Sequence, residues 1–146
     1  MPLAKVNETR YGHRVGDDGG CFAHALASVR VYGGVLEHPA ASAAWDAHEL
    51  PRPNQAGWMG TFCGGWVAQV SQSTYGHKAR KRTWLYLMGE PPAMRWDESE
   101  PVALTSWLQK TNSELPRLSK REASATPPAF RDLLLDMARS AQRVAA

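Results

Sequence analysis

The segment from Thr83 to Met88 places the strongest constraint on the fold of this chain. It reads Thr-Trp-Leu-Tyr-Leu-Met and is closed by Gly89, a composition that is typical of a β-strand. In residues 65–72, apolar side chains are spaced by two, and this period also indicates a strand. Tyr75-Gly76-His77 indicates a turn between them. The two runs therefore predict an antiparallel strand pair.

Apolar residues at helical spacing flank the strand pair on both sides. They predict a helix over 18–32, capped by Asp17 or Asp18 and ended by Gly33-Gly34. A second set predicts an amphipathic closing helix that starts at Pro127-Pro128, because proline suits a first helical turn.

A short apolar run predicts a buried strand over 34–37, and Ser42 is expected to cap a helix that ends near His48. These elements predict an α/β fold with one short strand and an antiparallel strand pair, flanked by helices. We expect strand 83–88 to run antiparallel to strand 34–37 and to lie between it and strand 65–71.

Length and composition favour one globular domain. The chain has 146 residues, 43% hydrophobic and 21% charged. Residues 1–16 lack periodicity and predict an irregular lead-in, so the domain is expected over 17–146. No apolar run approaches the roughly 18 to 20 residues that cross a bilayer, and the start of the chain does not resemble a secretory signal. With two cysteines, we expect a reduced, cytoplasmic protein that does not enter a membrane.

The charge is distributed unevenly along the chain. Residues 50–89 contain no Asp or Glu, but they contain Arg52, Lys78, Arg80, Lys81 and Arg82, whereas the whole chain carries a net charge of +3. Such a local basic patch favours a partner that bears phosphate groups.

Two segments carry candidate chemistry. Glu37 comes just after the buried apolar run Val35-Leu36, where a partly desolvated carboxyl group can donate a proton, although a solvated loop glutamate is the commoner outcome for this position. Arg80 and Arg82 share one face of an extended chain, so an anion or a carboxylate is expected between them. A solvated charge run explains these two arginines equally well.

Three motifs in order resemble the later motifs of DNA cytosine-C5 methyltransferases of the phage and prophage type. Leu36-Glu37-His38-Pro39 is similar to that family's Glu-Asn-Val/Pro motif. Tyr75-Gly76, the Arg80-Lys81-Arg82 run and the strand to Gly89 resemble its Tyr-Gly…Arg-x-Arg segment. Ala123-Ser124-Ala125-Thr126-Pro127-Pro128 is similar to its last motif, for which an ordinary helix cap is the alternative.

The resemblance implies a role for each matching residue. Glu37 would contact the ring nitrogen of a flipped cytosine, Arg82 would approach the carbonyl oxygen of the base, and Arg80 would brace the site. A protonated carboxyl group and a guanidinium would stabilise negative charge on the attacked ring. Lys78 and Lys81 would hold the DNA backbone. The segment at Ser124 and Ala125 would border S-adenosylmethionine.

The family's nucleophilic Pro-Cys pair and its glycine-rich cofactor loop have no counterpart in this sequence. The resemblance therefore implies a partial Rossmann-like sheet, equivalent to the carboxyl-terminal half of such an enzyme. We expect that it needs a complementary amino-terminal half to methylate DNA.

Two other function classes remain open. Asp17-Asp18-Gly19-Gly20-Cys21 resembles the nucleophile segment of ovarian-tumour-type cysteine proteases, in which Cys21 would attack. The candidate bases are His13, His38, His48 and His77; a buried Cys21 that packs a helix is the alternative. A non-catalytic nucleic-acid-binding module needs only the basic patch and an exposed tryptophan such as Trp58, Trp66 or Trp84. The alternating apolar neighbours of Trp66 and Trp84 favour core positions for these two residues.

A metal site is the weakest alternative. Cys21, His24 and His38 have a spacing that permits ligation, but the sequence offers no evident fourth ligand.

Overall fold

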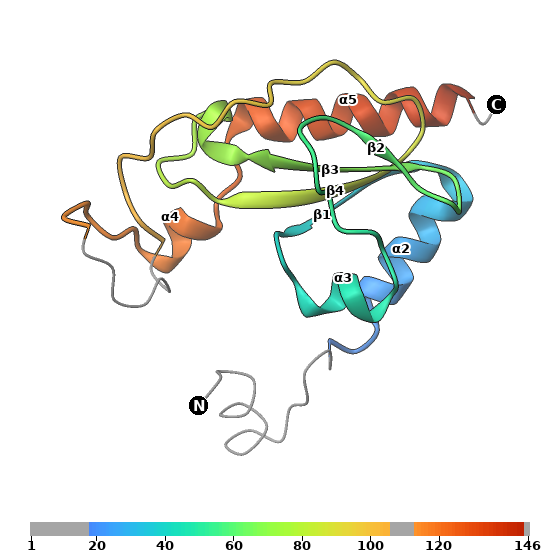
Figure 1. Cartoon of the computed structure of the whole chain (residues 1–146), viewed down its shortest axis with the longest axis horizontal. Coiled ribbons are helices and arrows are strands. Elements are labelled where there is room, and N and C mark those ends of the chain that lie inside the picture. Colours follow the sequence, from blue (N-terminus) through green and yellow to red (C-terminus); the bar gives the residue numbers. More distant parts are fainter. Residues whose placement is uncertain (1–17, 106–112, 145–146) are drawn as a thin grey trace.

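A four-stranded antiparallel sheet organises the computed structural model, which describes residues 18–105 and 113–144 (Figure 1). The strand order is β1-β4-β3-β2, and each neighbouring pair is antiparallel. The bounds are Gly34–Pro39 for β1, Met59–Gly60 for β2, Trp66–Ser71 for β3 and Arg82–Met88 for β4. The predicted position of strand 83–88 between the other two is confirmed, and the lead-in predicted over 1–16 lies outside the described residues.

Helices cover both faces of this sheet. The helices of the described residues are α2 (Cys21–Tyr32), α3 (Ala43–Ala47), the 3-10 helix η1 (Gln72–Tyr75), α4 (Lys120–Ser124) and α5 (Pro128–Val144). Residues of α2 and α3 pack into one apolar layer and residues of α5 into another, on opposite sides of the sheet (Figure 1). None of the helices in the described ranges is long and apolar enough to cross a membrane.

Side-chain hydrogen bonds near the start of α2 and a glycine at its end account for the bounds of this helix. The carboxylate of Asp18 accepts hydrogen bonds from the backbone N–H groups of Gly20 and Phe22, both at 2.9 Å, and chiefly the bond from Phe22 lowers the pKa of Asp18. The helix ends at Gly33, which has a φ of 76° and donates to Val29 O at 2.9 Å. A Cβ at Gly33 would lie 3.1 Å from Ala141 Cβ, so this position requires glycine for both backbone angle and space.

The first apolar layer lies between the sheet and helices α2 and α3. Trp45 is fully buried in it, with its ring 5.5 Å from that of Trp84 in an edge-on arrangement. The indole Nε1 of Trp45 donates to Pro51 O at 3.0 Å, so this buried polar group is satisfied. Phe22 and Tyr86 complete the contacts around it.

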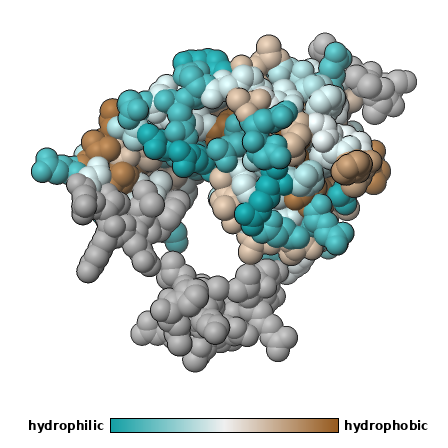
Figure 2. All heavy atoms as spheres, in the orientation of Figure 1, coloured by the Kyte–Doolittle hydropathy of each residue, from teal (hydrophilic) through white to brown (hydrophobic). Residues whose placement is uncertain are grey.

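The second apolar layer lies between the sheet and α5. Leu85 and Leu87 of β4 pack with Phe130 and Met137 of α5, which confirms the predicted amphipathic helix. The chain that follows β4 is tied to the same layer, because Trp58 Nε1 donates to Pro92 O at 2.9 Å. On the face seen in Figure 2, the hydrophobic residues form small separate groups among hydrophilic ones.

Three expectations differ from the structure. Strand β1 extends to Pro39 because its pairing with β4 continues that far, so Glu37 lies within the strand and not beyond its end. Trp66 is 36% exposed, because its neighbours Val67 and Ala68 fill the core positions. Helix α4 had no predicted counterpart; a capping box between Ser119 and Glu122 starts it.

The Trp45 side chain provides a test of the first apolar layer. Trp45→Ala should lower the free energy of unfolding by about 3 to 5 kcal/mol, since it opens a cavity and leaves Pro51 O unpaired. Urea denaturation followed by circular dichroism measures this change. Val31→Ala, at a side chain that is 71% exposed, is the control and should shift stability by less than about 0.5 kcal/mol. A small effect of Trp45→Ala would show that this layer is not a core.

Candidate functional site

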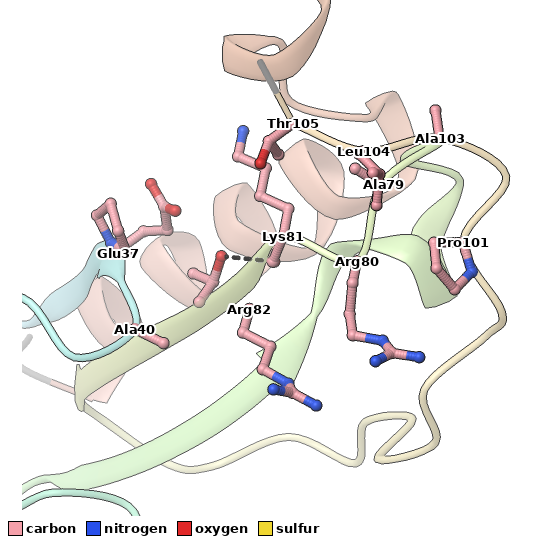
Figure 3. Close-up of a pocket in the computed structure, with 12 residues that line it drawn as sticks. Glu37, Ala40, Ala79, Arg80, Lys81, Arg82, Pro101, Ala103, Leu104 and Thr105 are labelled. Atoms are coloured by element: carbon pink, nitrogen blue, oxygen red, sulfur yellow. Dashed lines mark hydrogen bonds between the residues drawn. The ribbon is translucent and has the colours of Figure 1, made fainter. Parts of the chain in front are cut away.

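The residues singled out by the sequence motifs meet at one end of the sheet. Glu37, Arg80, Lys81 and Arg82 line a single cavity of about 460 Å³ (Figure 3). The third motif also reaches this place, because Lys81 Nζ donates to the carbonyl oxygens of Ser124 at 3.2 Å and Ala125 at 3.1 Å. The walls of the cavity are otherwise mostly apolar, and include Pro39, Ala40, Ala79, Pro101, Ala103 and Leu104.

The charged side chains occupy two different sides of β4. In Figure 3, Glu37 and Lys81 extend to one side of the strand and its lead-in, whereas Arg80 and Arg82 extend to the other. Lys81, and not Arg82, is therefore the cation on the side of Glu37.

A buried amide connects the two strands behind Glu37. Gln72 is fully buried, and its Nε2 donates to Thr83 Oγ1 at 2.9 Å and more weakly to Glu37 Oε1 at 3.4 Å. Thr83 Oγ1 in turn donates to Lys81 O at 3.2 Å. This network holds Glu37 beside Lys81. A glutamine at the end of an alternating strand carries no sequence signal of such a role, so sequence reasoning missed it.

Lys81 has an unusual backbone for its residue type. Its φ is 40°, in the left-handed region that favours glycine. Its ammonium group lies against the carbonyl end of α4, where cations are favoured. Burial lowers the pKa of Lys81, and the charge of Glu37 opposes that shift.

Arg80 and Arg82 share one carboxylate, as predicted. Glu98 Oε1 accepts from Arg82 Nε at 2.6 Å, and Glu98 Oε2 lies 3.2 Å from Arg80 Nε. Glu100 lies 3.8 Å from Arg80 as well. The hydrogen bond from Arg82 is the main cause that lowers the pKa of Glu98. The two acidic residues belong to a loop whose sequence gives no contact information.

The basic patch of residues 50–89 is partly neutralised by these acids and by others from outside the patch. Arg52 pairs with Asp46, and Lys78 lies 3.7 Å from Glu122. Within the described ranges, Lys81 is the member of the patch without a carboxylate ion pair. A uniform phosphate-binding surface is therefore less well supported than a local site around Lys81.

For the alternative site around Cys21, the structure shows an exposed thiol and candidate histidines that contact other groups. Cys21 is exposed at the start of α2, so the expectation of a buried packing role is wrong. His77 is buried and bound to the backbone of Ala79. His38 and His48 each contact the ring of Phe22, with centroids 5.0 Å apart, and His13 lies outside the described residues.

No group of three or more His, Cys, Asp or Glu side chains in 18–105 and 113–144 could hold a metal ion. The metal site suggested by Cys21, His24 and His38 is therefore wrong. Comparison of the chain with protein-family models, with curated proteins and with solved structures finds no match.

The backbone of Lys81 gives a matched pair of variants. Lys81→Gly and Lys81→Ala both remove the amine, but glycine tolerates the left-handed angle. Lys81→Gly should therefore be about 1 kcal/mol more stable than Lys81→Ala. Chemical denaturation of both proteins measures the difference. Equal stability would show that residue 81 is not held at a positive φ.

The Glu98 ion pair predicts a pH dependence. A carboxyl group whose folded pKa is lowered stabilises the protein fully above its unfolded pKa of about 4.3, and this stabilisation is lost as the pH falls through the lowered value. Arg82→Ala should flatten the acid loss of stability, by at most about 1 kcal/mol because the pair is exposed. Unfolding curves between neutral and acid pH measure this, and identical profiles would contradict it.

Proposed function

We propose that this chain binds DNA and takes one unpaired cytosine into the cavity lined by Glu37 and Lys81, as a module related to DNA cytosine-C5 methyltransferases. The observation that carries the proposal is the convergence of three motifs. Segments 36–39, 75–89 and 123–128 are far apart in the sequence, yet their motif residues lie around one cavity or contact a residue that lines it.

The strand arrangement supports the same proposal. Strands β1 and β3 run in one direction, with β4 antiparallel between them, which is the order that the resemblance implies for the second half of a methyltransferase sheet. Strand β1 is at the edge of this sheet, and an edge strand offers unpaired backbone groups to another chain. In our proposal, a complementary half docks there and completes a Rossmann-like sheet.

The cavity has the properties of a site for a planar base. Its volume of about 460 Å³ falls within the range of small-molecule sites, and such sites combine apolar walls with a few polar groups. Glu37 can hydrogen-bond the ring nitrogen of a cytosine, and Lys81 can donate to an acceptor on the base. In our proposal, Arg80 and Arg82, which Glu98 holds on the other side of the strand, approach the DNA backbone.

The residues assigned to the cofactor do not form a site for it by themselves. The carbonyl oxygens of Ser124 and Ala125 accept hydrogen bonds from Lys81, and the sequence lacks the glycine-rich loop of the family. We therefore propose no methyl-transfer step for this chain alone, and we expect its DNA binding not to respond to S-adenosylmethionine.

Fluorescence anisotropy with labelled duplexes tests the proposal. A duplex with a mismatched cytosine should bind more tightly than the matched duplex, because an unpaired base leaves the stack at lower cost. Lys81→Gly should weaken binding to the mismatched duplex by roughly tenfold, a loss typical of one base contact. The control is Arg139→Ala, on the exposed side of α5, which should bind as the wild type does.

The same assay separates the proposal from its alternatives. Equal affinity for matched and mismatched duplexes, with no effect of Lys81→Gly, would contradict a base-binding cavity and favour a non-specific binding module. Cys21→Ser should leave DNA binding unchanged. Absence of DNA binding together with rapid reaction of Cys21 with a thiol probe would favour the cysteine hydrolase.

A further inference from the structure

Lys81 differs from the other described lysines in its surroundings. It lines the cavity of about 460 Å³ that Glu37 also lines, and most other walls of that cavity are apolar. Lys78 and Lys120 are exposed, and Lys78 lies 3.7 Å from Glu122. Lys81 is half-buried and, within the described ranges, forms no carboxylate ion pair. Its amine therefore lies beside a cavity with no counter-ion bound to it.

The two hydrogen bonds of the Lys81 amine are compatible with its neutral form. Nζ donates to the carbonyl oxygens of Ser124 at 3.2 Å and of Ala125 at 3.1 Å. An ammonium group has three N–H donors, whereas the neutral amine has two N–H donors and a lone pair. The neutral form can keep both hydrogen bonds, and its lone pair remains available to an electrophile. Both acceptor residues are exposed, so the amine is not sealed inside the protein.

The environment of Lys81 favours the neutral amine more than the environment of a surface lysine does. Burial lowers the pKa of Lys81, although the charge of Glu37 opposes that shift. A desolvated lysine in an apolar cavity is a nucleophile toward carbonyl compounds, with which it forms an imine. The left-handed backbone of Lys81, with its φ of 40°, is a separate observation in the same direction, because such strain is concentrated at functional sites.

Glu37 is placed to transfer protons for this chemistry. Gln72 Nε2 donates to its Oε1 at 3.4 Å, and Glu37 extends to the same side of β4 as Lys81 (Figure 3). An amine that adds to a carbonyl group must lose its protons, and the former carbonyl oxygen must gain them before it can leave as water. A carboxyl group within reach performs both transfers.

We propose that Lys81 is a nucleophile that forms an imine with an aldehyde in this cavity. The lone pair of Nζ attacks the carbonyl carbon and a carbon–nitrogen bond forms. The carbonyl oxygen leaves as water with the two protons of the amine, which Glu37 transfers. The choice of aldehyde, the open-chain sugar of an abasic site in DNA, rests on the proposed function, because a cavity that takes up an unpaired nucleotide also accepts one that lacks its base. The nucleophilic role of Lys81 does not rest on it.

Reductive alkylation of the whole wild-type chain tests the nucleophile. Limiting propionaldehyde with excess cyanoborohydride converts each imine into a stable propylamine, and peptide mass spectrometry locates the propyl groups. At neutral pH, Lys81 should be labelled before Lys78 and Lys120, because those two amines are exposed and remain protonated. Labelling of Lys81 that is no faster than that of the other two would overturn the proposal.

The variant Glu37→Gln tests the proton transfer in the same assay. Labelling of Lys81 should become slower, because glutamine cannot carry a proton to the leaving oxygen. If Glu37 acted only through its charge, the variant would speed the labelling, since that charge raises the pKa of Lys81. Faster or unchanged labelling would therefore contradict the role of Glu37. The control is Glu100→Gln, at a side chain that is 92% exposed, which should leave the rate unchanged.

A duplex with one aldehydic abasic site tests the source of the aldehyde. Borohydride should trap a covalent adduct between this duplex and Lys81 of the wild-type chain. The adduct should be lost in Lys81→Arg, which keeps the positive charge but has no nucleophilic amine, and it should persist in Lys78→Arg. An adduct that maps to Lys78 or Lys120 of the wild-type chain would overturn the assignment to Lys81.

The two aldehydes separate this proposal from the proposed function. Preferential labelling of Lys81 by propionaldehyde, together with the abasic adduct, supports both proposals. Preferential labelling without an abasic adduct retains the nucleophile and excludes abasic DNA as its substrate; loss of DNA binding in the anisotropy assay would then contradict the proposed function alone. Equal labelling of the three lysines overturns the nucleophile, whatever the anisotropy assay shows for DNA.

Discussion

The burial of β4 on both faces is the constraint on which the rest of the structure depends. Trp84 and Tyr86 face the layer of α2 and α3, whereas Leu85 and Leu87 face α5. A strand with apolar side chains in both directions has to be covered twice, and it has to be paired along both edges. Strands β1 and β3 supply the pairing, and α2 with α3 on one face and α5 on the other supply the two covers.

The charged side chains at the start of β4 are also divided between two sides, and this division organises the candidate site. On one side, Arg80 and Arg82 form ion pairs with Glu98. On the other side, Lys81 lies on the side of Glu37, and Thr83 is hydrogen-bonded to Gln72. The charged side chains at this end of the strand are therefore separated into two groups. The left-handed backbone of Lys81 is a strained conformation of a kind that is common at functional sites, and the ammonium group of the same residue donates to the carbonyl oxygens of Ser124 and Ala125.

Paired charges change how the basic segment can act. Most of its cations are engaged by carboxylates from other parts of the chain, so recognition is expected at a few defined donors and not over a broad surface. Lys81 beside Glu37 is such a place.

The sequence by itself determined strands β1, β3 and β4, helices α2, α3 and α5, and the central position of strand 83–88, because these follow from local periodicity and from the burial that an apolar strand requires. Strand β2 and helix α4 were not predicted. It also indicated that an anion or a carboxylate would lie between Arg80 and Arg82, with a solvated charge run as an equal alternative. Only the tertiary structure decided that the carboxylate is Glu98, that Gln72 supports Glu37, and that Lys81 replaces Arg82 beside it. Those facts depend on contacts between distant segments and on the face that each side chain takes, which no local pattern records.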